Sequence, residues 1–398
     1  MNKTIKYYIN FLLIFCMEVL IISCSSQKKR ENNDLTKGFV PNPQLVEEQP
    51  HETLTIGASA PDFILPDTNG EMVSLSDFSK AKVLVVVFTC VHCPTAQAYE
   101  DRLIQFTKDY KDKGVQVVAI MPNSNLGLSP EELGYTEYDD AYGNMKKRSE
   151  EKHFNFPFLY DGDDHHVSVK YGPTSTPHVF VFDQERKLQY VGNVDQNEKP
   201  GTGHGENLRA ATDAVLAGKK VENPVTKAFG CSIKWAWKSG SVAHTTERWQ
   251  AKPVELNEIE VAGIKDLMKN DSKNLRLINV WATWCGPCVV EYPELVILQR
   301  TFGARDFEFI SISADNISNK EKVLEFLKKN YSALPNYIYS EGDKYKLIEA
   351  VDPDWSGALP YSVLIEPGGK IVWKYQGDVD VLELKKTIVN HPMIGRYF

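Results

Sequence analysis

The most informative segment of the chain reads Trp281-Ala282-Thr283-Trp284-Cys285-Gly286-Pro287-Cys288. A mainly apolar segment from Leu275 to Trp281 leads into it and predicts a buried strand, and helical spacing of apolar residues from Val289 to Phe302 predicts a helix directly after it. Two cysteines with only two residues between them cannot link distant parts of a fold, and their spacing is typical of reversible disulfide exchange. We therefore predict a redox site where this strand passes into this helix.

The first half of the chain contains a second pair in the same setting, in Cys90-Val91-His92-Cys93-Pro94. A β-branched run from Val83 to Phe88 precedes it, and helical spacing from Ala96 to Tyr110 follows it. Each half then continues with a strand, a helix and a hairpin, expected at 115–121, 142–153, 179–182 and 188–191 in the first half and at 307–313, 320–329, 361–365 and 371–375 in the second. The repeated order predicts an α/β protein of two tandem domains, each a central mixed sheet flanked by helices.

The domain limits follow from changes in pattern along the chain. We expect the first domain at 53–236 and the second at 257–398. Residues 237–256 include Ser239-Gly240-Ser241 and show no clear periodicity, so we expect a flexible linker there.

The N-terminus has the pattern of an exported protein. Lys3 and Lys6 precede an apolar run from Ile9 to Ile22, which is long enough for the core of a signal peptide and short for a membrane span. The run ends at Ser23-Cys24 and turns abruptly polar, which resembles a bacterial lipobox, in which the cysteine is acylated. We expect a lipoprotein signal peptide at 1–24, a tether at 25–52, and a lipid-anchored protein of the bacterial cell envelope that faces the periplasm or the cell surface. An uncleaved signal anchor or a plain secretory signal is the alternative.

Composition narrows the class of protein. At 398 residues the chain is long enough for two to three domains, and 42% hydrophobic with 25% charged residues is ordinary for a globular protein. A formal net charge of -8 disfavours nucleic acid as a partner, because that partner calls for a basic surface.

Both halves resemble known families. The second resembles the membrane-tethered thiol-disulfide reductases of the cytochrome c maturation type, through Trp284 to Cys288, Glu291, Pro293 and Leu359-Pro360. The first resembles the peroxiredoxin-like branch of the redoxins; the matching segments are Gly57 to Gly70, Phe88 to Pro94, Tyr99 to Arg102 and Gly230 to Trp235. These resemblances imply two thioredoxin-like domains, protein thiols or disulfides as clients, an upstream membrane or periplasmic electron donor, and no cofactor.

Disulfide exchange needs a thiolate as the attacking group. A cysteine at a helix N-terminus ionises more readily, because unpaired N–H groups and the positive end of the helix dipole face it. We expect Cys285 and Cys90 in that position, with Cys288 and Cys93 as buried resolving partners. A static disulfide or half of a zinc site is the competing interpretation of each pair, and zinc normally takes two such pairs within one domain.

Residues around the cysteines adjust the chemistry. Gly286-Pro287 resembles the reducing dipeptide of thioredoxin, whereas a cationic His92 would stabilise the Cys90 thiolate, which predicts a more oxidising first site. Glu291 lies one helical turn after Cys288 and either tunes the pair or is a solvated glutamate. Trp284 precedes the second pair as a further supporting residue.

A proline stands before the first hairpin strand in each half, Pro177 and Pro360. In the thioredoxin-like fold the proline at this place is cis and faces the cysteines, so the resemblance implies this role for both. An ordinary edge-strand proline is the alternative.

Several interpretations stay open for the first half. Peroxiredoxins have a Pro seven residues and a Thr three residues before the attacking cysteine, and an Arg at the cis-proline position. This chain has Val86, Cys90 and Pro177 at those three positions, so we favour disulfide exchange over peroxidase activity.

A Cu(I) site is another alternative, and it would use Cys90, Cys93 and a histidine such as His178. Cys231 is either a resolving thiol or merely buried. Asp163-Asp164-His165-His166 is better explained as a solvated loop than as a metal site.

The two pairs also leave the flow of electrons open. Either Cys285 and Cys288 reduce Cys90 and Cys93 in an internal relay, or the two domains serve separate clients.

Overall fold

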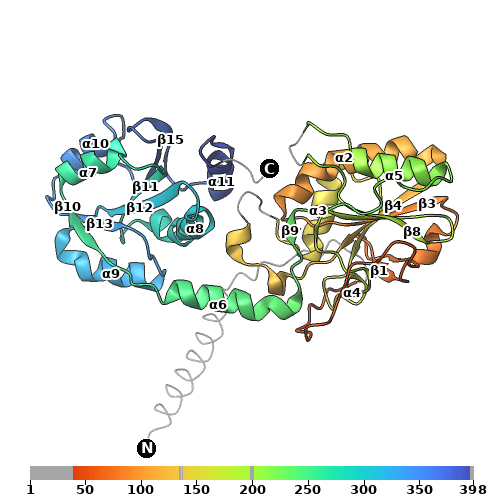
Figure 1. Cartoon of the computed structure of the whole chain (residues 1–398). Helices are drawn as coiled ribbons and strands as arrows, with labels where there is room; N and C mark the ends of the chain where they lie inside the picture. The colour runs from red at the N-terminus through yellow and green to blue at the C-terminus, as the bar shows by residue number, and fades with distance from the viewer. Residues whose placement is uncertain (1–38, 134–135, 137, 198–200, 395–398) are drawn as a thin grey trace, which may run out of the picture.

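The computed structural model describes residues 39–133, 136, 138–197 and 201–394. It shows two lobes, with α6 (Ser239–Gln250) running between them (Figure 1). The expected signal peptide and Cys24 lie outside the described residues. Within the described part of the chain, no helix combines the length and the apolar character needed to cross a membrane.

The first lobe is built on a five-stranded sheet in the order β5-β4-β3-β7-β8. β3 lies in the middle because every residue in it is apolar and buried, which suits a strand covered on both faces. The strands are β3 (Val83–Phe88), β4 (Val115–Met121), β5 (Phe158–Tyr160), β7 (His178–Phe182) and β8 (Leu188–Gly192). The helices are α2 (Pro94–Tyr110), α3 (Tyr142–Lys152), α4 (Ser168–Tyr171) and α5 (Glu206–Leu216), and two small two-stranded sheets pair β1 (Ile64–Pro66) with β2 (Met72–Ser74) and β6 (Ser175–Thr176) with β9 (Cys231–Ser232).

The second lobe repeats this plan. Its sheet runs β10-β13-β12-β11-β14-β15, so β13-β12-β11-β14-β15 matches the order of the first sheet and β10 adds a parallel edge strand. The strands are β10 (Asn257–Ile259), β11 (Leu275–Trp281), β12 (Phe307–Ser313), β13 (Asn336–Tyr339), β14 (Tyr361–Ile365) and β15 (Ile371–Gln376), and the helices are α7 (Val261–Lys269), α8 (Gly286–Phe302), α9 (Lys320–Lys329), α10 (Lys344–Val351) and α11 (Val381–Asn390). The predicted pair of α/β domains with flanked mixed sheets is confirmed.

Alternation along the central strands produces two apolar layers in each lobe. In β3, Val83, Val85 and Val87 pack with residues of α2, α3 and α5, while Leu84 and Val86 face the other side of the sheet with residues of α4. This is the two-residue side-chain period of a strand. The sheets are therefore covered on both faces, and the ends of β3 and β11 point the cysteine pairs towards the start of the next helix.

Two segments differ from the predicted tether and linker. The expected flexible linker forms α6, a helix without a buried residue, which explains why the sequence shows no apolar period there. Residues 39–52, expected as part of the tether, lie against the first lobe: Phe39 packs edge-on against Tyr142, and His51 packs against Trp235. Their aromatic rings provide the apolar contact that a free tether lacks.

Candidate active sites

The second cysteine pair lies at the start of α8. Cys285 is the N-cap residue of this helix, and its Sγ accepts a hydrogen bond from the Cys288 backbone N–H at 3.4 Å. The two cysteines form a disulfide. Cys288 is fully buried and Cys285 is 6% exposed, so Cys285 is the sulfur nearer to solvent.

The residues around Cys285 leave its side of the helix open. Trp284 is 66% exposed, which is unusual for so large an apolar side chain. Gly286 and Pro287 are the first two residues of α8, where the missing N–H of a proline costs no helix hydrogen bond. A side chain at Gly286 would meet no atom within 4 Å. The surface beside the disulfide is thus apolar and unobstructed.

Pro360 and Pro177 both follow cis peptide bonds, Leu359-Pro360 and Thr176-Pro177. Tyr361, the residue after Pro360, pairs with Val280 near the end of β11, and His178, the residue after Pro177, pairs with Phe88 at the end of β3. Both prolines therefore lie at the sheet edge from which the cysteine pairs emerge.

Glu291 is buried on α8, three residues after Cys288, and is not a solvated glutamate. Its carboxylate accepts hydrogen bonds from Asn279 Nδ2 at 3.0 Å and from the Val379 N–H at 2.9 Å. Burial outweighs these bonds and, with the nearby Asp378 charge, raises the pKa of Glu291 to about 7. The carboxyl group can therefore take up or release a proton near neutral pH.

The first pair is placed differently on its helix. Cys93, not Cys90, is the N-cap residue of α2, and its Sγ accepts a hydrogen bond from the Ala96 N–H at 3.4 Å. The prediction of Cys90 at the helix N-terminus is wrong. Pro94 takes the first helical position, and the N–H groups of Val91 and His92 donate to the Asp140 carboxylate instead of starting the helix.

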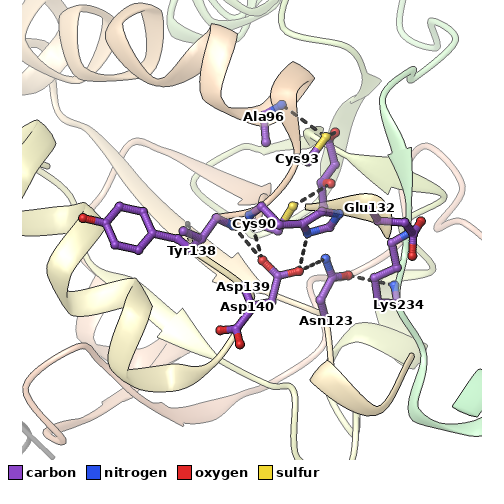
Figure 2. Close-up of polar contacts among 12 residues, drawn as sticks. Cys90, Cys93, Ala96, Asn123, Glu132, Tyr138, Asp139, Asp140 and Lys234 are labelled. Atoms are coloured by element: carbon purple, nitrogen blue, oxygen red, sulfur yellow. Dashed lines mark hydrogen bonds and ion pairs between the residues drawn. The ribbon is translucent and has the colours of Figure 1, made fainter. Parts of the chain in front are cut away.

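Asp140 lies at the centre of the polar contacts of the first site (Figure 2). Its Oδ2 lies 2.6 Å from His92 Nδ1 and accepts a hydrogen bond from Asn123 Nδ2 at 2.7 Å. Burial alone would lower the pKa of His92, but the Asp140 carboxylate reverses this and raises it. A protonated His92 is therefore a buried cation beside the thiols.

The cation acts on Cys93 and not on Cys90, contrary to the sequence-based expectation. Burial opposes ionisation of Cys93, but hydrogen bonds from Cys231 and Cys90, the charge of His92 and the Ala96 N–H outweigh it and hold the pKa of Cys93 well below that of a free thiol. Burial and the hydrogen bond to Cys93 raise the pKa of Cys90. The geometry thus makes Cys93 the thiolate of the first site.

Sequence reasoning left several residues of this site unassigned. Thr176 lies between the thiols, with its Oγ1 3.0 Å from Cys90 Sγ and its carbonyl oxygen 3.5 Å from Cys93 Sγ. Asp140 and Asn123 come from loops that carry no motif, so nothing in the sequence marks them. Cys231 lies opposite Thr176 in the β6–β9 pair, which brings it to the first site.

The structure does not bring together the residues of the alternative Cu(I) site, and it changes the interpretation of the 163–166 segment. Among the described residues, the ligand atoms of Cys90, His92 and Asp140 lie within 4.8 Å of one another, and no such group joins Cys90, Cys93 and His178. His165 is buried, accepts a hydrogen bond from the Ala236 N–H and has a pKa lowered to about 4 by burial, so it is a structural side chain and not part of a solvated loop. Asp161, Asp164 and His166 do lie close together, as acidic loop residues often do.

Comparison with known proteins agrees with this geometry. The Redoxin family model matches residues 55–206 and 265–388, more than half of the chain. The chain belongs to the Redoxin family. This membership confirms the thioredoxin-like resemblance of both halves.

Individual relatives cover parts of this redoxin. The thiol-disulfide oxidoreductase ResA of Bacillus subtilis is 29% identical over 140 residues, which are 35% of this chain and 68% of that protein. A Mycobacterium tuberculosis protein provisionally named as a peroxiredoxin, MT2597, is 32% identical over 171 residues, 39% of this chain and 93% of its own length. The solved structure of the hypothetical protein SMc02350 from Sinorhizobium meliloti is 35% identical, covers 46% of this chain and 96% of its own, and has a TM-score of 0.41. The ResA proteins of Bacillus subtilis and Bacillus cereus, both named thiol-disulfide oxidoreductases, confirm the predicted class of enzyme.

Proposed function

We propose that this redoxin is an exported, lipid-anchored enzyme that exchanges disulfides with proteins of the cell envelope through two Cys-x-x-Cys sites. The observation that carries the proposal is the repeated geometry: in both lobes a cysteine pair joins the central strand to a helix, beside a cis-proline. Export and anchoring rest on the sequence of residues 1–24.

At the second site, Cys285 is the attacking residue. In the reduced protein its position at the N-terminus of α8 favours the thiolate. This thiolate attacks one sulfur of a client disulfide and releases the other as a thiol, which gives a mixed disulfide. Cys288 then attacks Cys285 Sγ, releases the second client thiol and leaves the internal disulfide. The exposed ring of Trp284 supplies an apolar contact for the client, and Glu291 is suited to hold the proton that Cys288 loses.

At the first site, Cys93 takes the attacking role and Cys90 the resolving one. Stabilising the Cys93 thiolate stabilises the reduced form of the first pair. The Cys90–Cys93 disulfide is therefore a stronger oxidant than a pair whose thiolate is not stabilised. This supports electron flow from Cys285 and Cys288 to Cys90 and Cys93, with separate clients for the two lobes as the alternative. The linker is the helix α6 and not a flexible tether, so the effective concentration of one cysteine pair at the other depends on how this helix holds the two lobes.

Peroxidase activity of the first lobe is the second candidate function. One observation favours it: the ionised Cys93 stands where peroxiredoxins have their attacking cysteine. The Thr and Arg that activate peroxide are replaced by Cys90 and Pro177. Peroxide consumption by the reduced full chain distinguishes the two reactions.

The test of the proposed function is insulin reduction by the full chain. We expect Cys285→Ser to abolish the activity that depends on the second site and Cys288→Ser to accumulate mixed disulfides, because the resolving step is missing. Both assays are run in a chain whose Cys90 and Cys93 are serine, so that the first site contributes nothing. Unchanged turnover in Cys285→Ser would refute the assignment.

A further inference from the structure

The first site contains three thiols and not two. The pKa of Cys93 depends on both Cys90 and Cys231, as expected for three neighbouring thiols. Cys90 and Cys93 also contact the Oγ1 and the carbonyl oxygen of Thr176, respectively. Cys231 is the cross-strand partner of the same Thr176. One residue therefore gathers all three cysteines.

The strand that carries Cys231 is held close to this point. Gly230 has a φ of 139°, and a Cβ there would lie 2.1 Å from the Thr176 carbonyl oxygen, so only glycine allows this approach. After Cys231, the Lys234 N–H donates to Asn123 Oδ1 at 2.9 Å, and the same Asn123 contacts Asp140. The loop is thus fixed to the network that ionises Cys93 (Figure 2).

The three thiols differ in access to solvent. Cys93 is fully buried and Cys90 is 3% exposed, whereas Cys231 is partly exposed. Phe229, Gly230 and Ser232, which flank Cys231, line a surface groove of about 630 Å³. A disulfide that includes Cys231 therefore lies closer to an incoming thiol than the Cys90–Cys93 disulfide does.

We propose that Cys231 is a third redox thiol of the first site, which moves the disulfide from the Cys90–Cys93 pair to a Cys93–Cys231 pair. The Cys231 thiolate attacks Cys93 Sγ, the Cys231–Cys93 bond forms, and the Cys90–Cys93 bond breaks. Cys90 leaves as a thiolate and takes up the proton that Cys231 gave away, so no electrons are gained or lost. The proposal rests on the redox role proposed above for Cys90 and Cys93.

Peptide mapping of the full chain tests the exchange directly. Trypsin leaves Cys90 and Cys93 together in the peptide 83–102 and Cys231 in the peptide 228–234. After mild oxidation with oxidised glutathione, acid quenching and alkylation, the new disulfide appears as these two peptides linked, with Cys90 alkylated. We expect the linked pair in the wild-type chain, a several-fold increase in Cys90→Ser, where Cys93 has one partner left, and its loss in Cys231→Ala.

Two further variants separate chemistry from folding. Ser232→Ala, the neighbour of Cys231 on β9, should leave the linked pair unchanged, and Gly230→Ala should reduce it several-fold because β9 is pushed away from Thr176. If Cys231 stays alkylated both in the wild-type chain and in Cys90→Ser, while the wild-type chain still forms the Cys90–Cys93 disulfide, the proposal is overturned and the proposed function stands. If neither Cys90 nor Cys93 is ever oxidised, the proposed function of the first site is overturned as well.

Discussion

The buried carboxyl group of Glu291 makes the stability of the second lobe depend on pH. Its pKa is raised to about 7, mainly by burial, against about 4.3 for a free glutamate. Below about pH 4 the group is neutral in both the folded and the unfolded chain. As the pH rises from there to about 7, only the unfolded chain ionises freely, so the stability contributed by the neutral form is lost progressively. Above about pH 7 the loss is complete and constant.

Its magnitude follows from the two pKa values. They differ by about 2.7, and at about 1.4 kcal/mol for each pH unit this sets an upper limit of about 4 kcal/mol, which screening by nearby solvent lowers to an expected value of about 2 kcal/mol. Glu291→Gln removes the ionisation. The glutamine fits because Asn279 Oδ1 has no hydrogen-bond partner among the described residues, so a rotated Asn279 amide can accept from the new NH₂ group.

We therefore expect Glu291→Gln to match the wild-type chain at about pH 4.5 and to be more stable by about 2 kcal/mol at about pH 8. Thermal unfolding of the oxidised full chain across this range measures the difference, as a Tm shift of roughly 6 °C for a lobe of this size. The exposed Glu294 on the same helix provides the control, since Glu294→Gln should leave the pH profile unchanged. A difference between wild type and Glu291→Gln that does not vary with pH would refute the reasoning.

Three further predictions concern the other parts of the chain. Asp140→Asn should remove the charge that keeps His92 protonated and raise the pKa of Cys93, whereas Asp139→Asn should not change it. The pH midpoint of Cys93 alkylation should therefore move upward, and at a pH below both pKa values the rate should fall about tenfold for each unit of the rise. Cys24→Ala should abolish labelling with a radioactive fatty acid and release the protein from the membrane fraction; membrane recovery of this variant would indicate a different anchor. The relay is tested with two full-length variants: one has serine at 90, 93 and 231 and a reduced second site, and the other has serine at 285 and 288 and an oxidised first site. We expect the first variant to reduce the Cys90–Cys93 disulfide of the second; if that disulfide stays oxidised at equilibrium, the relay is wrong.

The central strands were predictable because they are buried on both faces. β3, β4, β11 and β12 have the residue limits expected from the sequence, since each is a mainly apolar or alternating run in the middle of a sheet. β9 has two residues, and its partner Thr176 lies 55 positions earlier in the chain. A pairing between such short and distant segments leaves no period to detect.

The cysteine pairs were predictable from spacing, but the division of roles within the first pair was not. The start of α2 at Pro94 could have been predicted from the sequence, because proline is favoured at the first helical position. The ionisation of Cys93 could not. It depends on Asp140, which lies 48 positions from His92 and reaches the site only through the fold.

The two sites show how one fold produces two kinds of thiol. In the second lobe Cys285 caps α8 and Gly286 begins the helix, so the first cysteine of the pair faces the helix dipole at the edge of the solvent. In the first lobe α2 begins three residues later within the motif, so the helix dipole falls on the second cysteine. That cysteine is buried, and a thiolate there would be costly without a compensating charge. The His92 cation, paired with Asp140, provides this charge. Because both side chains are buried, solvent ions weaken the attraction between the cation and the thiolate only a little. The different helix start thus explains why the first site needs a buried cation and the second site does not.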